Sequence, residues 1–172
     1  LPVRYHDAND VVERFDPPVV EFHYSYNDLE KPVPEHLSSS LNGRKIVVHA
    51  PELFSDSEIL DLCSEDAEYR QRSLENLQKV FDLTNKLHEF VGYTNGKIPV
   101  VTNVGGWSVH EFKPKDEASK LYDRFADTAS FLEKGHAELI VQNMAPFPWH
   151  FGGQRYQNIF LDPKEISDFC RQ

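Results

Sequence analysis

The sequence is poor in several kinds of residue, and each scarcity narrows the possible functions. Its 18 lysines and arginines stand against 28 aspartates and glutamates, which gives a formal net charge of -10. A broad nucleic-acid interface needs clustered basic residues to replace phosphate counterions, so this charge argues against one. No apolar run approaches the ~20 residues of a membrane helix, and no signal-peptide pattern opens the chain. We therefore expect a cytoplasmic protein.

Cysteine is equally scarce. The two cysteines, Cys63 and Cys170, both lie in segments with a helical pattern. We predict small buried thiols in a reducing compartment, with a disulfide or a nucleophile as the alternatives. The sequence contains no His-Glu-x-x-His, Cys-x-x-Cys, P-loop or Gly-x-Ser-x-Gly pattern, so no common motif identifies the chemistry.

Three β-branched apolar runs end directly in polar or glycine-rich residues. The first polar side chains after these runs are His49, Asn103 and Gln142, and long helical patterns separate the runs. In α/β folds, sites are built at the carboxyl ends of parallel strands. We therefore expect the active face at these three strand ends.

Hydrophobic periodicity and capping signals predict alternating helices and strands. Helices are expected at residues 7–15, 55–58, 65–91, 114–133 and 162–169, and strands at 19–24, 45–50, 98–103 and 137–142. No strand is expected before residue 7, and residues 26–43 are expected to form a long polar loop that can hold one helical turn. This order predicts an α/β fold with a parallel sheet, in a single domain over residues 1–172. The acidic run at residues 56–66 and five scattered histidines are interpreted as solvated surface.

Several segments resemble the xylose-isomerase-like TIM barrels, a superfamily that includes sugar-phosphate isomerases and epimerases and the endonuclease IV group. The resemblance rests on His49-Ala50-Pro51, the helix around residues 73–77, the turn at residues 103–106, and Gln142-Asn143-Met144. It implies a partial TIM barrel, covering about the second to fifth strands. We expect the remainder of the barrel either in a longer chain or in a second copy, as a homodimer.

The resemblance also implies a divalent metal (Zn, Mn or Mg), with His49 as a ligand. Asn103 stands where a second histidine is common, and Gln142 stands where a glutamate serves as ligand and base. A glutamine is neutral and cannot act as a base, and an asparagine lacks the imidazole that suits Zn or Mn. The metal site has therefore lost a charge and a strong ligand, which puts the metal in doubt.

Further residues at the strand ends are candidates for chemistry or binding. We predict His49 and Glu52 as acid/base residues. Asn103, Gly105 and Gly106 form a turn whose backbone N–H groups can approach a phosphate, with a tight structural turn as the alternative. Gln142 and Asn143 can bind hydroxyls.

The segment at residues 146–155 combines aromatic residues with a histidine and an arginine. We predict that Trp149 and His150 contact a carbohydrate and that Arg155 grips a phosphate or carboxylate. A structured loop or a subunit interface is the alternative. Glu21 and His23 alternate along a strand, so both are expected to face the barrel interior or its mouth.

Three functions follow from these observations. The first is a sugar or sugar-phosphate isomerase/epimerase, which would abstract a proton next to a carbonyl or shift a hydride. The second is a catalytically silent barrel that serves as a binding or assembly domain of a larger sugar-biosynthesis protein, because residues 4–7 and 21–29 resemble a sialic-acid-synthase-like enzyme. The third, a DNA-repair endonuclease, is disfavoured by the charge of -10.

Overall fold

The computed structural model of the chain describes residues 1–37 and 41–171, so residues 38–40 of the predicted loop lie outside the described part. The residues group into two units. Unit 1 comprises residues 1–58, 76–102 and 133–140, and unit 2 comprises residues 59–75, 103–132 and 141–172. The single domain over residues 1–172 stays a prediction.

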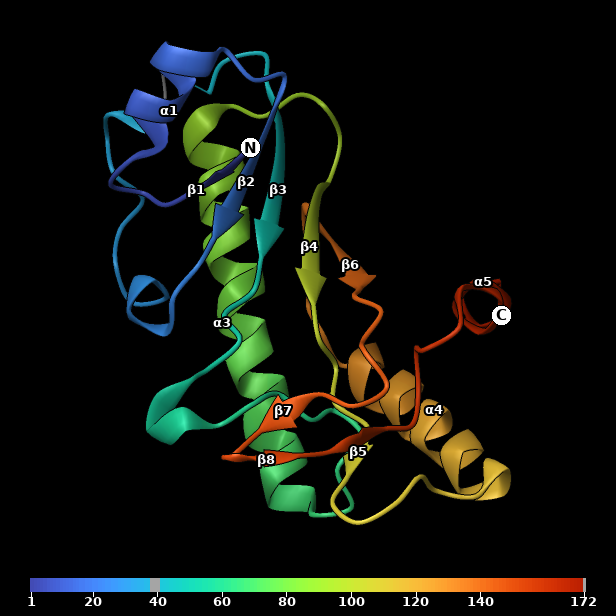
Figure 1. Cartoon of the computed structure of the whole chain (residues 1–172). Helices are drawn as coiled ribbons and strands as arrows, with labels where there is room; N and C mark the ends of the chain where they lie inside the picture. Colours follow the sequence, from blue (N-terminus) through green and yellow to red (C-terminus); the bar gives the residue numbers. More distant parts are fainter. Residues whose placement is uncertain (38–40, 172) are drawn as a thin grey trace. The chain divides into compact units, whose positions relative to one another are not determined.

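A five-stranded sheet forms the centre of unit 1 (Figure 1). Its order is β1-β2-β3-β4-β6, and the pairs β1/β2, β2/β3 and β3/β4 are parallel. The strands are β1 (Pro2–Val3), β2 (Val19–His23), β3 (Lys45–His49), β4 (Ile98–Thr102) and β6 (Ala137–Val141). The predicted α/β fold with a parallel sheet is confirmed. The expectation of no strand before the first helix is wrong, because two residues are too few to show the period-2 pattern of a strand.

One face of the sheet is closed by the second half of helix α3 (Ala67–Val91) (Figure 1). Apart from the exposed Lys45, residues of β2, β3 and β4 alternate between buried and half-buried, as the pleat of a strand requires. The buried set continues to Tyr24, whose side chain hydrogen-bonds Thr84 of α3. The buried α3 residues of unit 1 include Leu77, Val80, Phe81, Thr84 and Leu87. The opposite face therefore carries the alternate residues, among them Glu21, His23 and His49.

The other helical elements of unit 1 are short. Away from residues 38–40 and their helical neighbour Leu37, they are α1 (Ala8–Phe15) and the 3-10 turns η1 (Tyr26–Asp28) and η2 (Ser55–Ser57). The capping-box helix expected at residues 55–58 is only the turn η2. Phe54 precedes that turn, and Glu58 already has extended backbone angles. Gly92 ends α3 in the left-handed region at φ +60°, as its sequence position predicts.

Unit 2 contains two helices and two small antiparallel ribbons. The helices are α4 (Lys115–Ser130) and α5 (Pro163–Phe169). One ribbon pairs β5 (Trp107–Ser108) with β9 (Tyr156–Gln157), and the other pairs β7 (Trp149–His150) with β8 (Gly153–Gln154). The predicted start of α5 is confirmed, since the Asp162 side chain accepts a hydrogen bond from the Lys164 N–H. The ribbons were not predicted, because each strand has only two residues.

An aromatic cluster attaches α5 to α4 in unit 2. The ring of Phe169 lies 5.2 Å from Tyr122, 5.7 Å from Phe125 and 5.4 Å from Phe160, between ring centroids. Phe160 also packs edge-on against both α4 rings. No residue of α5 is fully buried. The ring of Phe169, together with the hydrogen bond between Glu165 and Tyr122, therefore holds α5 to α4.

Replacing Asp66 with alanine is expected to lower the free energy of unfolding by about 1 kcal/mol, the usual cost of losing a helix cap. Its Oδ1 accepts hydrogen bonds from the N–H groups of Glu68 (2.9 Å) and Tyr69 (3.1 Å), so Asp66 caps α3. Ser64, the predicted cap, instead accepts from the Asp66 N–H. Urea unfolding measures the effect. An equal or larger loss in Ser64→Ala would contradict this assignment.

Candidate functional site

Two histidines and a glutamate meet at the carboxyl ends of β2 and β3 in unit 1. His23 and His49 are direct partners in the parallel register. Their rings stack with centroids 4.9 Å apart and an angle of 13° between the planes. The Oε1 of Glu21 lies 2.9 Å from Nε2 of His23. The strand geometry thus creates a Glu-His-His cluster on the sheet face that α3 does not cover.

The cluster is open enough to exchange protons with a ligand. The side chains of His23 and Glu21 are 37% and 36% exposed, and His49 is half-buried. Nδ1 of His49 lies 2.9 Å from the carbonyl oxygen of Ala50, which can only accept, so Nδ1 carries the hydrogen of this contact. In the neutral ring, Nε2 is then left as the proton acceptor. Glu52, the other predicted acid/base residue, is exposed beyond the end of β3.

These residues do not form a metal site by themselves. No group of three or more His, Cys, Asp or Glu side chains with metal-binding geometry occurs in the described residues. Glu21 and His23 already contact one another, and stacked parallel rings do not direct two nitrogens at one ion. Within the described part of the chain, the divalent metal that the sequence resemblance implies has no complete ligand set.

The predicted anion-binding turn lies in unit 2, and its two glycine N–H groups have partners within the protein. The Gly105 N–H donates to Oδ1 of Asn103, and the Gly106 N–H donates to Oδ1 of Asp61, both at 3.0 Å. The side-chain amide of Gln157 donates to the Gly105 carbonyl. The negative group held by this turn is therefore the carboxyl of Asp61.

Asp61 is a buried acid that sequence analysis missed. The acidic run at residues 56–66 was expected to be solvated, but Asp61 is only 7% exposed. Its Oδ1 accepts from the N–H groups of both Cys63 and Gly106. Burial raises the pKa of Asp61 to about 6, partly offset by these hydrogen bonds. Its neighbours Leu60, Leu62 and Cys63 are apolar and buried, which was the available signal.

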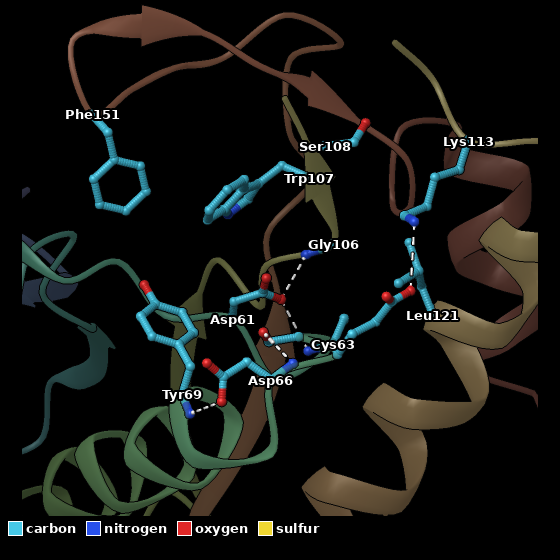
Figure 2. Close-up of a pocket in the computed structure, with 12 residues that line it drawn as sticks. Asp61, Cys63, Asp66, Tyr69, Gly106, Trp107, Ser108, Lys113, Leu121 and Phe151 are labelled. Carbon is cyan, nitrogen blue, oxygen red and sulfur yellow. Dashed lines mark hydrogen bonds and ion pairs between the residues drawn. The ribbon is translucent and has the colours of Figure 1, made fainter. Parts of the chain in front are cut away.

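A pocket of about 440 Å³ opens beside Asp61 within unit 2 (Figure 2). The rings of Tyr69, Trp107 and Phe151 surround the space next to the Asp61 carboxyl, and Lys113 lies at one side (Figure 2). The remaining lining residues are Cys63, Ser64, Glu65, Asp66, Gly106, Ser108 and Leu121. The pocket combines apolar walls with a few charged groups, which is typical of small-molecule sites.

The predicted carbohydrate contacts of residues 142–155 also lie in unit 2. Gln142 is half-buried and Asn143 is exposed. Trp149 is 71% exposed, and His150 is half-buried with its ring centroid 6.1 Å from that of Trp107. Arg155 donates from Nη1 to the Gln154 carbonyl and lies 6.0 Å from the Phe151 ring centroid. His150 thus lies near the Trp107 ring and Arg155 near the Phe151 ring, and both rings line the pocket. Trp149 is largely exposed to solvent.

The cysteine predictions are confirmed in part. Cys63 is buried and free, and burial together with the neighbouring Asp61 charge raises the pKa of its thiol well above the ordinary value. Such a thiol is a poor nucleophile at neutral pH. Cys170 is free and exposed, so its predicted burial is wrong. Among the described residues, no helix is long and apolar enough to cross a membrane.

Several solved structures share this fold. A D-tagatose 3-epimerase-like protein is 17% identical with a TM-score of 0.62, and the alignment covers 99% of this chain and 60% of that one. An L-ribulose 3-epimerase is 14% identical with a TM-score of 0.59, and the alignment covers 99% of this chain and 56% of that one. A protein from Thermus thermophilus, soaked with ZnCl2, is 19% identical with a TM-score of 0.54. The alignment covers 82% of this chain and 54% of that one. The chain thus spans a little over half the length of these proteins.

No curated protein matches the sequence. A sequence model of the xylose isomerase-like TIM barrel matches residues 10–172, nearly the whole chain. This match agrees with the parallel βα units of the structure, with the fold of its structural neighbours, and with the resemblance seen at the strand ends. The chain belongs to the xylose isomerase-like TIM barrel family.

Proposed function

We propose that the chain is part of a sugar or sugar-phosphate isomerase/epimerase-like protein that acts on a carbohydrate at the carboxyl ends of the strands. The cluster of Glu21, His23 and His49 carries this proposal. Titratable groups in contact at strand ends are what proton transfer next to a carbonyl requires. The similarity in fold to a D-tagatose 3-epimerase-like protein and an L-ribulose 3-epimerase supports the same reaction class.

In this proposal, His49 is the base. Its Nε2 removes the proton from the carbon next to the carbonyl of an open-chain sugar, while its Nδ1–H stays bonded to the Ala50 carbonyl. Glu21 holds the His23 ring in place, and His23 donates a proton to the carbonyl oxygen as the enediol forms. His49 then returns its proton to the neighbouring carbon while His23 takes back a hydroxyl proton of the enediol, which completes isomerisation. Epimerisation would need a second acid, from outside this cluster, to protonate the opposite face. Of the residues in this cluster, His49 is the one that would contribute to holding a divalent metal.

The other predicted site residues belong to the same proposal. Glu52 is an additional acid in unit 1. In unit 2, the proposed contacts to a carbohydrate are Asn103, Gln142, Asn143, Trp149, His150 and Arg155. Gly105 and Gly106 are proposed as the turn beside Asn103, since their N–H groups donate to Asn103 and Asp61. A cytoplasmic location, and completion of the barrel by further chain or by a second copy, are likewise proposed.

Replacing His49 with glutamine is expected to lower the exchange of a sugar's carbon-bound proton at least ~100-fold, within the usual range for loss of a general base. The chain is incubated in D2O with D-tagatose, other ketohexoses and their phosphates, and exchange next to the carbonyl is followed by proton NMR. His110→Gln, at an exposed residue of unit 2, is the matched control. Unchanged exchange in His49→Gln would contradict the role of His49.

A catalytically silent barrel, kept as a binding or assembly domain of a larger sugar-biosynthesis protein such as a sialic-acid-synthase-like one, is the alternative function. The neutral Asn103 and Gln142 favour it, together with the missing three-ligand cluster in the described part of the chain. The same experiment separates the two. Carbohydrate binding without any proton exchange would support the silent barrel.

A further inference from the structure

We infer that the pocket of unit 2 binds a small organic cation, with its ammonium group at the Asp61 carboxyl and its carbon groups against Trp107 and Phe151 (Figure 2). This inference does not rest on the proposed function. All residues that line the pocket lie in unit 2, and none of them belongs to the Glu21-His23-His49 cluster.

The aromatic walls are suited to a cation. The rings of Trp107 and Phe151 lie 5.4 Å apart between centroids at an angle of 56°, so together they form a corner. Tyr69 adds a third ring (Figure 2). The faces of such rings are negative and attract ammonium and guanidinium groups. Two of the three rings already have a cation near them. The guanidinium carbon of Arg155 lies 6.0 Å from the Phe151 ring centroid, and that of Arg72 lies 5.4 Å from the Tyr69 ring centroid.

The charge balance of the lining points the same way. Three carboxyl groups line the pocket and only one lysine does. The Nζ of Lys113 lies 3.6 Å from Glu65 and 3.4 Å from Glu117, so its charge is already compensated. Asp66 is occupied in capping α3. Asp61 is therefore the acid available to a ligand.

The second oxygen of Asp61 is the atom that would meet the cation. Both main-chain donors bond to Oδ1, and Oδ2 has no hydrogen bond among the described residues. Arg70 and Arg124 act on Asp61 through their charge, but their guanidinium groups donate to the carbonyls of Ser64 and Cys63. A negative oxygen without a direct ion-pair partner repels phosphate and carboxylate groups. A neutral ligand would leave Oδ2 with only the more distant charges of Arg70 and Arg124.

Protons and a cation should compete for this carboxyl. Burial raises the pKa of Asp61 to about 6, so the group is ionised at pH 7 and mostly protonated at pH 5. The Cys63 thiol beside it stays neutral over this range, because its pKa is also raised. The affinity for a permanently charged cation should therefore fall as the pH is lowered from 7 to 5.

The test is calorimetric titration of the chain with choline, whose charge does not change with pH. The neutral carbon isostere 3,3-dimethylbutan-1-ol and inorganic phosphate are titrated in parallel. We expect choline to bind at least ~10-fold more tightly than the isostere, since a desolvated cation–π site and a carboxylate both discriminate charge. Phosphate should not bind. Equal affinity for choline and the isostere, or binding of phosphate, would overturn the inference.

Variants locate the site. Asp61→Asn should weaken choline binding about 10-fold and remove its pH dependence, and Phe151→Leu should weaken it several-fold at every pH. Glu138→Gln removes one negative charge from an exposed residue of unit 1 and should leave binding unchanged. Thermal unfolding checks that each variant is folded. Choline binding that survives both pocket substitutions would place the site elsewhere and refute the assignment.

Discussion

Replacing Gly105 with alanine is expected to lower the free energy of unfolding by about 3–5 kcal/mol, the range of severe core disruptions. Gly105 has φ +88°, a conformation that side chains disfavour. An added Cβ would also collide with Oδ1 of Asp61 and lie 2.5 Å from its Cα. A side chain could rotate away, but the main chain of Asp61 cannot move without breaking its hydrogen bond to Ser73. Urea unfolding at pH 7 measures the loss.

Gly96→Ala is the matched control for this substitution. Gly96 has nearly the same backbone angle, φ +92°, and a Cβ there would meet no atom within 4 Å. Gly96→Ala should lower the free energy of unfolding by only about 1 kcal/mol, the cost of placing a side chain at this backbone angle. The difference between the two variants isolates the contact with Asp61. Similar losses in both would show that residues 61 and 105 are not in close contact.

Replacing Asp61 with asparagine is expected to raise the free energy of unfolding at pH 7 by up to about 3 kcal/mol, because ~2 pKa units correspond to that energy. The pKa of Asp61 is raised from the ordinary 3.8 to about 6 in the folded chain. The folded state therefore binds the proton more tightly than the unfolded state does. Asp61 then contributes most stability below pH 4, and this contribution is lost as the pH rises from about 4 to 6. The asparagine Oδ1 still accepts from Cys63 and Gly106.

The stability of the wild type and of Asp61→Asn is compared by urea unfolding between pH 4 and pH 7. The gap between them should widen over this interval and level off above pH 6. Asp61→Ala provides the contrast, since it leaves the N–H groups of Cys63 and Gly106 without an acceptor and should destabilise unit 2 at every pH. A wild type that gains stability relative to Asp61→Asn as the pH rises would refute the raised pKa.

The main elements were predictable because their signals are local and repeated. The period of apolar residues and a terminal glycine define the 25 residues of α3, and Asp162 with Pro163 defines the start of α5. Strand β1 and the ribbons of unit 2 were missed because two residues show no period. The choice between Ser64 and Asp66 as the cap of α3 depends on where the chain turns, which residue type alone does not decide.

The candidate sites were predictable to a smaller extent. His49 was found because it ends an apolar run, and the alternation of Glu21 and His23 placed both on the same face. That His23 meets His49 depends on the register between two strands, which is a long-range property. Asp61 was missed because its burial is created by a distant segment, the glycine turn that donates to its Oδ1. Sequence patterns indicate which residues can act, and only the fold shows which of them meet.

Because α5 is attached through Phe169, the free energy of local unfolding should differ between α5 and α4. None of the seven residues of α5 is fully buried, so the helix can separate from α4 by releasing the Phe169 ring and the Glu165–Tyr122 hydrogen bond, while α4 itself stays packed. Local opening of this kind needs far less free energy than global unfolding. Amide protons of α5 should therefore exchange with solvent long before those of α4. A protease would meet this helix as an accessible segment of an otherwise folded protein.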